Sequence, residues 1–222
     1  RHGKIAEGLE ILETAWETAD VALVRAAAQV FLGLASEDRA TTARVETIVE
    51  KALERHQRPL SLLLILGDAY GIQGRIEESE TVYREVLQRD PKNVIALNNL
   101  GAMLALQGTK LDEAENLVRT AIDVAGPAGN LLDSYALVLI ARNKPTEALK
   151  VLAEAIEDQP TAILFLRQAQ AYRILGQSEA ANKAFEEAVK RGLTRESLHP
   201  LERKVFDELQ KLTSQTAGTK TS

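Results

Sequence analysis

The chain has 222 residues, of which 27 are Lys or Arg and 32 are Asp or Glu, giving a formal net charge of −5. This balance argues against nucleic-acid binding, because affinity for phosphate backbones draws on a basic surface. No apolar run approaches the roughly 20 residues of a membrane-spanning helix, so we expect a soluble segment without membrane insertion. The chain contains no cysteine, which excludes disulfides and thiolate metal sites and fits a cytoplasmic or a processed periplasmic location equally.

The first 59 residues are predicted to form degenerate copies of a unit made of a helix, a turn and a second helix, which repeats more clearly in the middle of the chain. Residues 1–20 contain GKIAEGLEILETAWE, which matches the turn and second helix of a unit whose first helix is missing. We therefore expect the chain to be a piece of a longer protein. Residues 21–59 contain LVRAAAQVFLGLA and TTARVETIVEKALERH, which predict a helix pair joined by a turn near Ser36, Glu37 and Asp38.

The middle of the chain repeats with a period of 34 residues, so that Leu66-Gly67 returns as Leu100-Gly101. Each unit is predicted to be a helix, a tight turn and a second helix. Glycine on the first helix costs roughly 1 kcal/mol in helix propensity but lets a neighbouring helix approach closely. The predicted units are residues 60–93, 94–128, 129–161 and 162–194.

The turn after the first helix of each unit holds a residue type that tolerates a left-handed backbone at a helix C-terminus. These four turn residues are Gly74, Gly108, Asn143 and Gly176. Because all four units agree, we expect this residue to lie in the turn that ends each first helix.

The pattern large-x-x-Leu-Gly-x-x-Tyr, followed by Gly and then by Ala, a large residue and Ala, resembles the tetratricopeptide repeat. The tryptophan usual in that family is replaced by Leu63, Leu97, Leu132 and Phe165. The resemblance implies an all-α fold: an α-α superhelix, or right-handed TPR solenoid of antiparallel helix pairs. Residues 1–213 are then expected to form a single array.

Residues 195–213 are predicted to form a capping helix, because an array needs a final helix with a polar outer face. Leu201, Val205, Leu209 and Leu212 are expected to form its buried stripe. The last residues, 214–222, are small and polar and predict a loose tail.

The sequence offers no catalytic, cofactor-binding or metal-binding constellation. His2, His56 and His199 are far apart and lack the ligand spacing of a metal helix. We therefore expect a non-catalytic protein-protein interaction scaffold that needs no cofactor and binds a protein or peptide. The alternative is a regulatory or docking segment of a larger enzyme whose catalytic domain lies outside this chain. A homo-oligomer is compatible with the sequence, but nothing in it indicates one.

The resemblance implies that the first helix of each unit lines a concave groove that receives the partner. Asn98 and Asn99 are the most informative positions there, because neighbouring asparagines add no packing and lower helix propensity. The alternative for this pair is a solvated or locally satisfied amide. The predicted groove residues are Leu64, Asp68, Asn98, Asn99, Ala102, Asp133, Arg167, Gln170 and Arg173.

Two binding patterns known in that family are not matched here. Members that hold a terminal carboxylate are expected to have lysines where this chain has Leu64 and Asn130. Members with an asparagine ladder repeat the asparagine found here at Asn99, whereas Ile65 and Ser134 stand in neighbouring units. The residues therefore predict the location of the groove but not its ligand.

Overall fold

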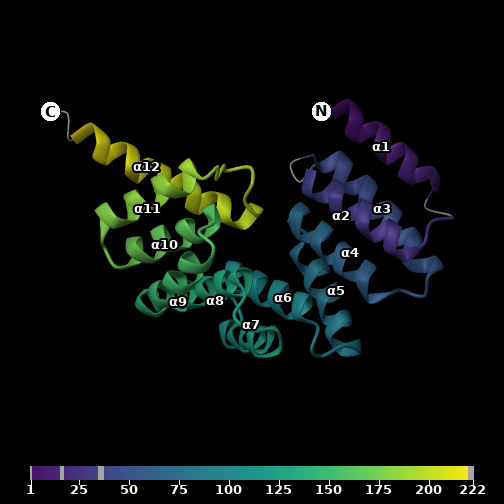
Figure 1. Cartoon of the computed structure of the whole chain (residues 1–222), viewed down its shortest axis with the longest axis horizontal. Helices are drawn as coiled ribbons and strands as arrows, with labels where there is room; N and C mark the ends of the chain where they lie inside the picture. Colours follow the sequence, from purple (N-terminus) through teal and green to yellow (C-terminus); the bar gives the residue numbers. More distant parts are fainter. Residues whose placement is uncertain (1, 16–17, 35–37, 220–222) are drawn as a thin grey trace. The chain divides into compact units, whose positions relative to one another are not determined.

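The computed structural model describes residues 2–15, 18–34 and 38–219, and over these residues the fold is all-α, as predicted. Consecutive helices are joined by short turns and follow one another in chain order (Figure 1). The helices are α1 (His2–Ala15), α2 (Val21–Leu34), α3 (Arg39–Arg55), α4 (Leu60–Gln73), α5 (Ile76–Arg89), α6 (Val94–Gln107), α7 (Leu111–Ala125), α8 (Gly129–Ala141), α9 (Pro145–Asp158), α10 (Ala162–Ile174), α11 (Ser178–Lys190), the 3-10 helix η1 (Pro200–Glu202) and α12 (Arg203–Thr219).

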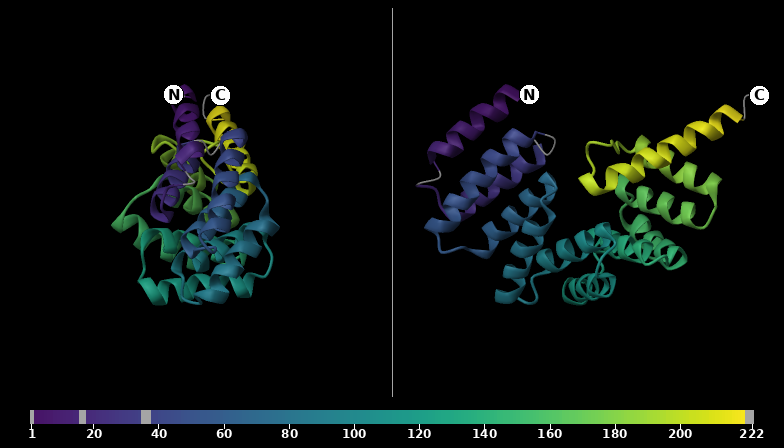
Figure 2. Two further views of the ribbon diagram at one scale, coloured as in Figure 1. Left: turned by 90° about the vertical axis from the view of Figure 1, so that its right-hand side faces the viewer. Right: turned by 180° about the vertical axis from the view of Figure 1, so that it is seen from behind.

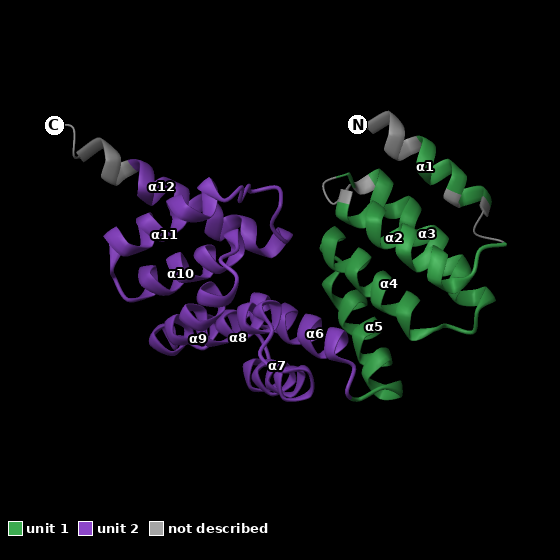
Figure 3. Ribbon diagram, in the orientation of Figure 1, with its two compact units in different colours: residues 1–91 green, residues 92–222 purple. Residues whose placement is uncertain are grey.

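The chain forms two compact units, shown in different colours in Figure 3. Unit 1 is Arg1–Pro91 and contains α1 to α5, and unit 2 is Lys92–Ser222 and contains α6 to α12. The boundary lies at the end of the predicted repeat 60–93. The units are described one at a time below, and a single array over residues 1–213 stays a prediction.

The predicted turn residues all adopt the left-handed conformation. The backbone φ is 77° at Gly74, 68° at Gly108, 71° at Gly176 and 58° at Asn143. Gly108 also donates its backbone N–H to the carbonyl oxygen of Ala105 at 3.0 Å, which satisfies a carbonyl at the end of α6. The sequence prediction for the ends of these first helices is confirmed.

The predicted turn between residues 21–34 and the following helix lies partly outside the described residues. Ser36 and Glu37 belong to that part of the chain. Asp38 is described, and its side chain caps α3 by accepting a hydrogen bond from the backbone N–H of Ala40 at 3.0 Å. This cap explains where α3 begins, because it satisfies one of the first N–H groups of the helix.

Helices pack in consecutive pairs, α4 with α5 in unit 1 and α6 with α7, α8 with α9 and α10 with α11 in unit 2. Two of these crossings depend on glycine. A Cβ atom on Gly101 would lie 2.6 Å from Cγ2 of Val118 and 3.1 Å from the carbonyl oxygen of Ala114. A Cβ atom on Gly67 would lie 2.8 Å from Cε1 of Tyr83. The glycines therefore permit the close helix contact that the repeat predicts.

The C-terminal helix packs on the last helix pair of unit 2. α12 contacts α10 and α11, and the turned views in Figure 2 show it running alongside them. Leu209 is fully buried, and the rings of Phe206 and Phe185 meet edge to face with centroids 5.1 Å apart. An aromatic pair in this arrangement contributes about 0.5–1.5 kcal/mol beyond the burial of its area.

The predicted buried stripe of the cap is wrong at two of its four positions. Leu201 and Leu212 are exposed, and the buried side of the segment is formed instead by Glu202, Phe206 and Leu209. The segment begins with a 3-10 turn and the α-helix starts at Arg203. Glu202, Phe206 and Leu209 nevertheless keep helical spacing and face the core, so Leu201 and Leu212 lie to one side of the buried face. α12 also continues to Thr219, into the stretch predicted as a tail.

Replacing Gly101 by alanine should lower the free energy of unfolding by about 1–3 kcal/mol, because the new methyl group overlaps Val118. The loss should appear although alanine is the better helix former. The measurement is urea unfolding followed by circular dichroism. Gly33→Ala on α2 is the matched control, because a Cβ atom there meets nothing within 4 Å. Equal stability of the two variants would contradict the packing role of Gly101.

Candidate functional site

Four residues of α6 lie on one face of the helix, at spacings of i, i+3, i+4 and i+7. They are Ile95, Asn98, Asn99 and Ala102, and we call them the α6 face. Ile95 is 53% exposed, while the other three are half-buried. Ile95 is therefore an apolar side chain presented to solvent beside two amides.

The two asparagines interact with each other but leave one atom unsatisfied. Nδ2 of Asn98 donates a hydrogen bond to Oδ1 of Asn99 at 3.1 Å. Oδ1 of Asn98 is buried and accepts no hydrogen bond from the described residues. A buried polar atom without a partner costs about 1–3 kcal/mol, so this oxygen lowers the stability of the fold. Because the oxygen is enclosed, the Asn98 side chain has to rotate before a ligand can use this acceptor.

In unit 1 the predicted residues are less accessible. Leu64 is buried on α4. Asp68 is half-buried, and its Oδ1 accepts a hydrogen bond from the hydroxyl of Tyr83 at 2.5 Å. The hydrogen bond of Asp68 thus joins α4 to α5.

Three predicted residues of unit 2 meet in one buried cluster. Arg167 is 3% exposed, and its Nε donates to Oδ1 of Asp133 at 3.1 Å. Its Nη1 donates to Oε1 of Gln170 at 3.4 Å and to Oε1 of Glu202. Glu202 comes from η1, and only 7% of its side chain is exposed. The structure thus brings α8, α10 and the start of the C-terminal helix together at Arg167.

The cluster contains two carboxylates and one guanidinium. Burial raises the pKa of Asp133, and the nearby charge of Glu202 raises it further, while Arg167 opposes both effects. Burial disfavours the charged form of Arg167, but the two carboxylates outweigh it and raise the pKa of the guanidinium. Arg167 is therefore charged, and the two acids share its positive charge.

Arg173, the last predicted residue, also faces the C-terminal helix. Its Nη1 lies 2.5 Å from Oε2 of Glu208, and both side chains are about one-third exposed. Glu202 and Glu208 each follow their arginine by 35 residues, close to the repeat length. This spacing of opposite charges is a signal that the sequence analysis missed.

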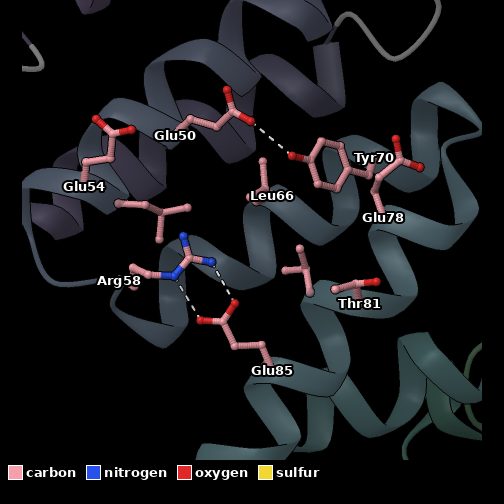
Figure 4. Close-up of a pocket in the computed structure, with 10 residues that line it drawn as sticks. Glu50, Glu54, Arg58, Leu66, Tyr70, Glu78, Thr81 and Glu85 are labelled. Atoms are coloured by element: carbon pink, nitrogen blue, oxygen red, sulfur yellow. Dashed lines mark hydrogen bonds and ion pairs between the residues drawn. The ribbon is translucent and has the colours of Figure 1, made fainter.

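A pocket of about 480 Å³ in unit 1 lies among α3, α4 and α5 (Figure 4). It is lined by apolar side chains and by four glutamates. The guanidinium of Arg58 faces the carboxylate of Glu85, with Nε–Oε1 3.0 Å and Nη2–Oε2 2.7 Å. The residues lining it are Glu50, Leu53, Glu54, Arg58, Leu66, Tyr70, Glu78, Thr81, Val82 and Glu85.

Tyr70 reports the acidic character of this pocket. Its hydroxyl donates to Oε1 of Glu50 at 3.0 Å. Burial, this hydrogen bond and the charges of Glu50 and Glu46 raise the pKa of Tyr70 to about 12, against a smaller opposing effect of Arg75. The phenol stays neutral and acts as a donor throughout the physiological pH range.

Among residues 2–15, 18–34 and 38–219, no group of three His, Cys, Asp or Glu side chains is placed to hold a metal ion. Within the same residues, no helix is long and apolar enough to cross a bilayer.

Family models match most of the repeated part of the chain. A TPR repeat model matches residues 67–108, and a tetratricopeptide repeat model matches residues 99–163 and 134–193. Together these matches extend over residues 67–193, more than half of the chain.

Three curated proteins illustrate the similarity. A TPR repeat-containing protein of Treponema pallidum is 30% identical over 76% of this chain and 20% of its own length. A TPR repeat-containing protein of Pseudomonas aeruginosa is 27% identical over 50% of this chain and 19% of its own length. The BBSome complex member bbs-4 of Caenorhabditis elegans is 27% identical over 56% of this chain and 27% of its own length. This chain therefore spans about a fifth to a quarter of these relatives.

Solved structures show the same fold. A thermophilic TPR protein of Thermus thermophilus superposes with a TM-score of 0.65 at 15% identity, covering 82% of this chain and 95% of its own. The pilF protein of Pseudomonas aeruginosa gives a TM-score of 0.60 at 20% identity, covering 87% of this chain and 89% of its own. At these identities the likeness concerns the architecture.

The D133N variant should gain stability relative to the wild type as the pH rises above about 4, the ordinary range for an aspartate. The pKa of Asp133 is raised in the folded state. Its stabilising contribution is therefore complete below the unfolded pKa and is lost as the pH rises through the folded pKa. Urea unfolding at a series of pH values measures the difference. D123N, at an exposed position on α7, is the control, and a D133N difference that is constant with pH would contradict the assignment.

The E50Q variant should lower the pKa of Tyr70 from about 12 toward the ordinary value of about 10. The substitution removes the negative charge but keeps an oxygen that can accept the phenol hydrogen bond. NMR titration of ¹³Cζ-labelled tyrosine measures the shift, and Y70F identifies the signal among the four tyrosines. E54Q is the control, because Glu54 lines the same pocket without bonding to Tyr70. An unchanged pKa in E50Q would contradict the role of Glu50.

Proposed function

This chain belongs to the tetratricopeptide repeat family, and we propose that it is a non-catalytic scaffold that binds a peptide segment of a partner protein through its first helices. The fold itself suggests a protein-protein interaction scaffold, because stacked helix pairs present extended surfaces to partners. The proposal for unit 2 places the contact on the α6 face.

The observation that supports this placement is the unsatisfied amide of Asn98. Its buried Oδ1 lacks a hydrogen-bond donor among the described residues, and native proteins keep few such atoms. Ile95 stands exposed one turn before it. Once the Asn98 side chain rotates outward, an arriving peptide can supply the missing donor, while Ile95 offers an apolar contact beside it.

A peptide backbone suits these groups because it provides N–H donors and C=O acceptors at regular intervals. A side-chain amide carries both a donor and an acceptor, so the Asn98–Asn99 pair can exchange hydrogen bonds with an extended or helical segment. Ile95 would then cover an apolar side chain of the same segment and bury area at about 25 cal/mol per Å².

The other predicted groove residues are proposed as secondary contacts. Leu64 and Asp68 belong to unit 1, where burial and the Tyr83 hydrogen bond limit their access. In unit 2 the four remaining positions either belong to the Arg167 cluster or face the C-terminal helix. These four are Asp133, Arg167, Gln170 and Arg173.

The double variant N98A/N99A should reduce retention of partner proteins by about tenfold or more, since hydrogen bonds to buried groups contribute about 1–3 kcal/mol. Cross-linking followed by mass spectrometry, using the full chain as bait in a lysate of the source cell, measures retention. N116A is the matched control, because Asn116 is an exposed asparagine of the same unit on α7. Equal retention by all three proteins, or loss with N116A alone, would refute the α6 face as the contact.

A further inference from the structure

The C-terminal segment, residues 193–212, lies on the first helices of unit 2. η1 contacts α6, and α12 contacts α10. Leu193, Leu198, Phe206 and Leu209 share one buried cluster with residues of α10 and α11. Part of the surface that the family resemblance assigns to a partner is thus covered by the chain itself.

The contact at the centre of this cover is ionic and buried. Glu202 forms an ion pair with Arg167, whose guanidinium also pairs with the carboxylate of Asp133. A buried ion pair gains little or nothing in stability over apolar residues of similar volume, because both charges lose their hydration. Its advantage is specificity: a segment that lacks the carboxylate leaves a buried guanidinium with one acid fewer. The pair therefore selects what lies on α8 and α10.

The C-terminal segment can also leave Arg167 without leaving the guanidinium unpaired. Two carboxylates compete for one guanidinium, and if Glu202 leaves, Asp133 still neutralises Arg167. Residues 191–199, which lead from α11 into η1, form no helix. The core formed by α8, α9 and α10 contains no residue of the segment. Departure of the segment would therefore leave the α8–α9 pair with its own core and expose the apolar side of α10 and α11 to an incoming helix.

We propose that the C-terminal segment is an internal ligand, which a helix of a partner protein displaces from α10 and α11. This inference rests on the proposed scaffold function and names the partner and its regulation. The partner helix presents an acidic residue, an aromatic residue four positions later and a leucine three positions after that. This order copies Glu202, Phe206 and Leu209, which are the residues that the site already accepts.

The pattern follows from the geometry of the site. Spacings of i, i+4 and i+7 place three side chains on one face of a helix. The carboxylate meets Arg167, the aromatic ring meets Phe185 edge to face, and the leucine completes the buried cluster. A peptide without the acid retains the apolar contacts but leaves Arg167 short of a partner.

The test uses the full chain and a fluorescent peptide that carries residues 194–212 of the same sequence. Wild-type protein should bind it weakly, because its own segment is in place. The F206A variant loosens that segment, and it should bind the peptide about tenfold tighter or more, since losing a buried aromatic side chain costs several kcal/mol of docking. Fluorescence anisotropy measures the affinities, and circular dichroism verifies the fold. E202Q provides a second loosened protein if F206A does not fold.

The peptide itself supplies the matched control. An E202Q peptide should bind the loosened protein at least about tenfold more weakly than the original, because a hydrogen bond to a charged group contributes about 1.5–3 kcal/mol. A Q210A peptide should bind as well as the original, because Gln210 is exposed. Equal binding of the E202Q and original peptides overturns the proposal, as does equal affinity of wild-type and loosened proteins.

Two further outcomes are decisive. If the loosened protein forms dimers by sedimentation without peptide, a second copy of the segment is the occupant and the partner helix is refuted. If the loosened protein does not bind the peptide while N98A/N99A still reduces partner retention, only the internal-ligand proposal is refuted. If the peptide binds as expected while N98A/N99A has no effect, only the α6 face falls.

Discussion

The close approach of paired helices at small residues determines how the rest of this chain can be used. At the α6–α7 crossing, Gly101 admits Val118 to within 2.6 Å of where a Cβ atom would stand. At the α4–α5 crossing, the hydroxyl of Ser79 donates to the carbonyl oxygen of Gly67 at 2.8 Å. Such contacts fix the rotation of each first helix about its axis. Once Gly101 faces α7, the helical period turns Ile95, Asn98 and Asn99 to another side of α6.

The features that the sequence predicted correctly are those decided within a few residues. A left-handed turn needs glycine or asparagine, so Gly74, Gly108, Asn143 and Gly176 could be identified without knowledge of distant contacts. The helix pairs followed from the same local pattern. The stripe of the capping helix was predicted less well, because its buried face is centred on Phe206 and Leu209, and this rotation depends on packing against α10 and α11.

The candidate site depended on contacts that no local pattern contains. Arg167 had the position expected of a groove residue, yet its burial comes from Glu202, which lies 35 residues later in the chain. Gln170 is buried beside it for the same reason. A search for opposite charges at the repeat spacing would have paired Arg167 with Glu202 and Arg173 with Glu208. The unsatisfied oxygen of Asn98, in contrast, required the atomic surroundings of α6 to be known.

The charged groups of unit 2 differ in what they can contribute. In pairs such as Arg119–Glu115 the arginine side chain is 60% exposed, and surface pairs of this kind are typically worth below about 1 kcal/mol. Arg167 is excluded from water, so the identity of each group that touches it matters far more.

Unit 2 thus offers two surfaces of opposite character. The α6 face holds an acceptor that still lacks a donor, whereas the Arg167 cluster already holds the acid it selects. A partner that engaged both would gain a new hydrogen bond at Asn98 but would only exchange one carboxylate for another at Arg167. Affinity would therefore come mainly from α6, and discrimination among partners mainly from Arg167.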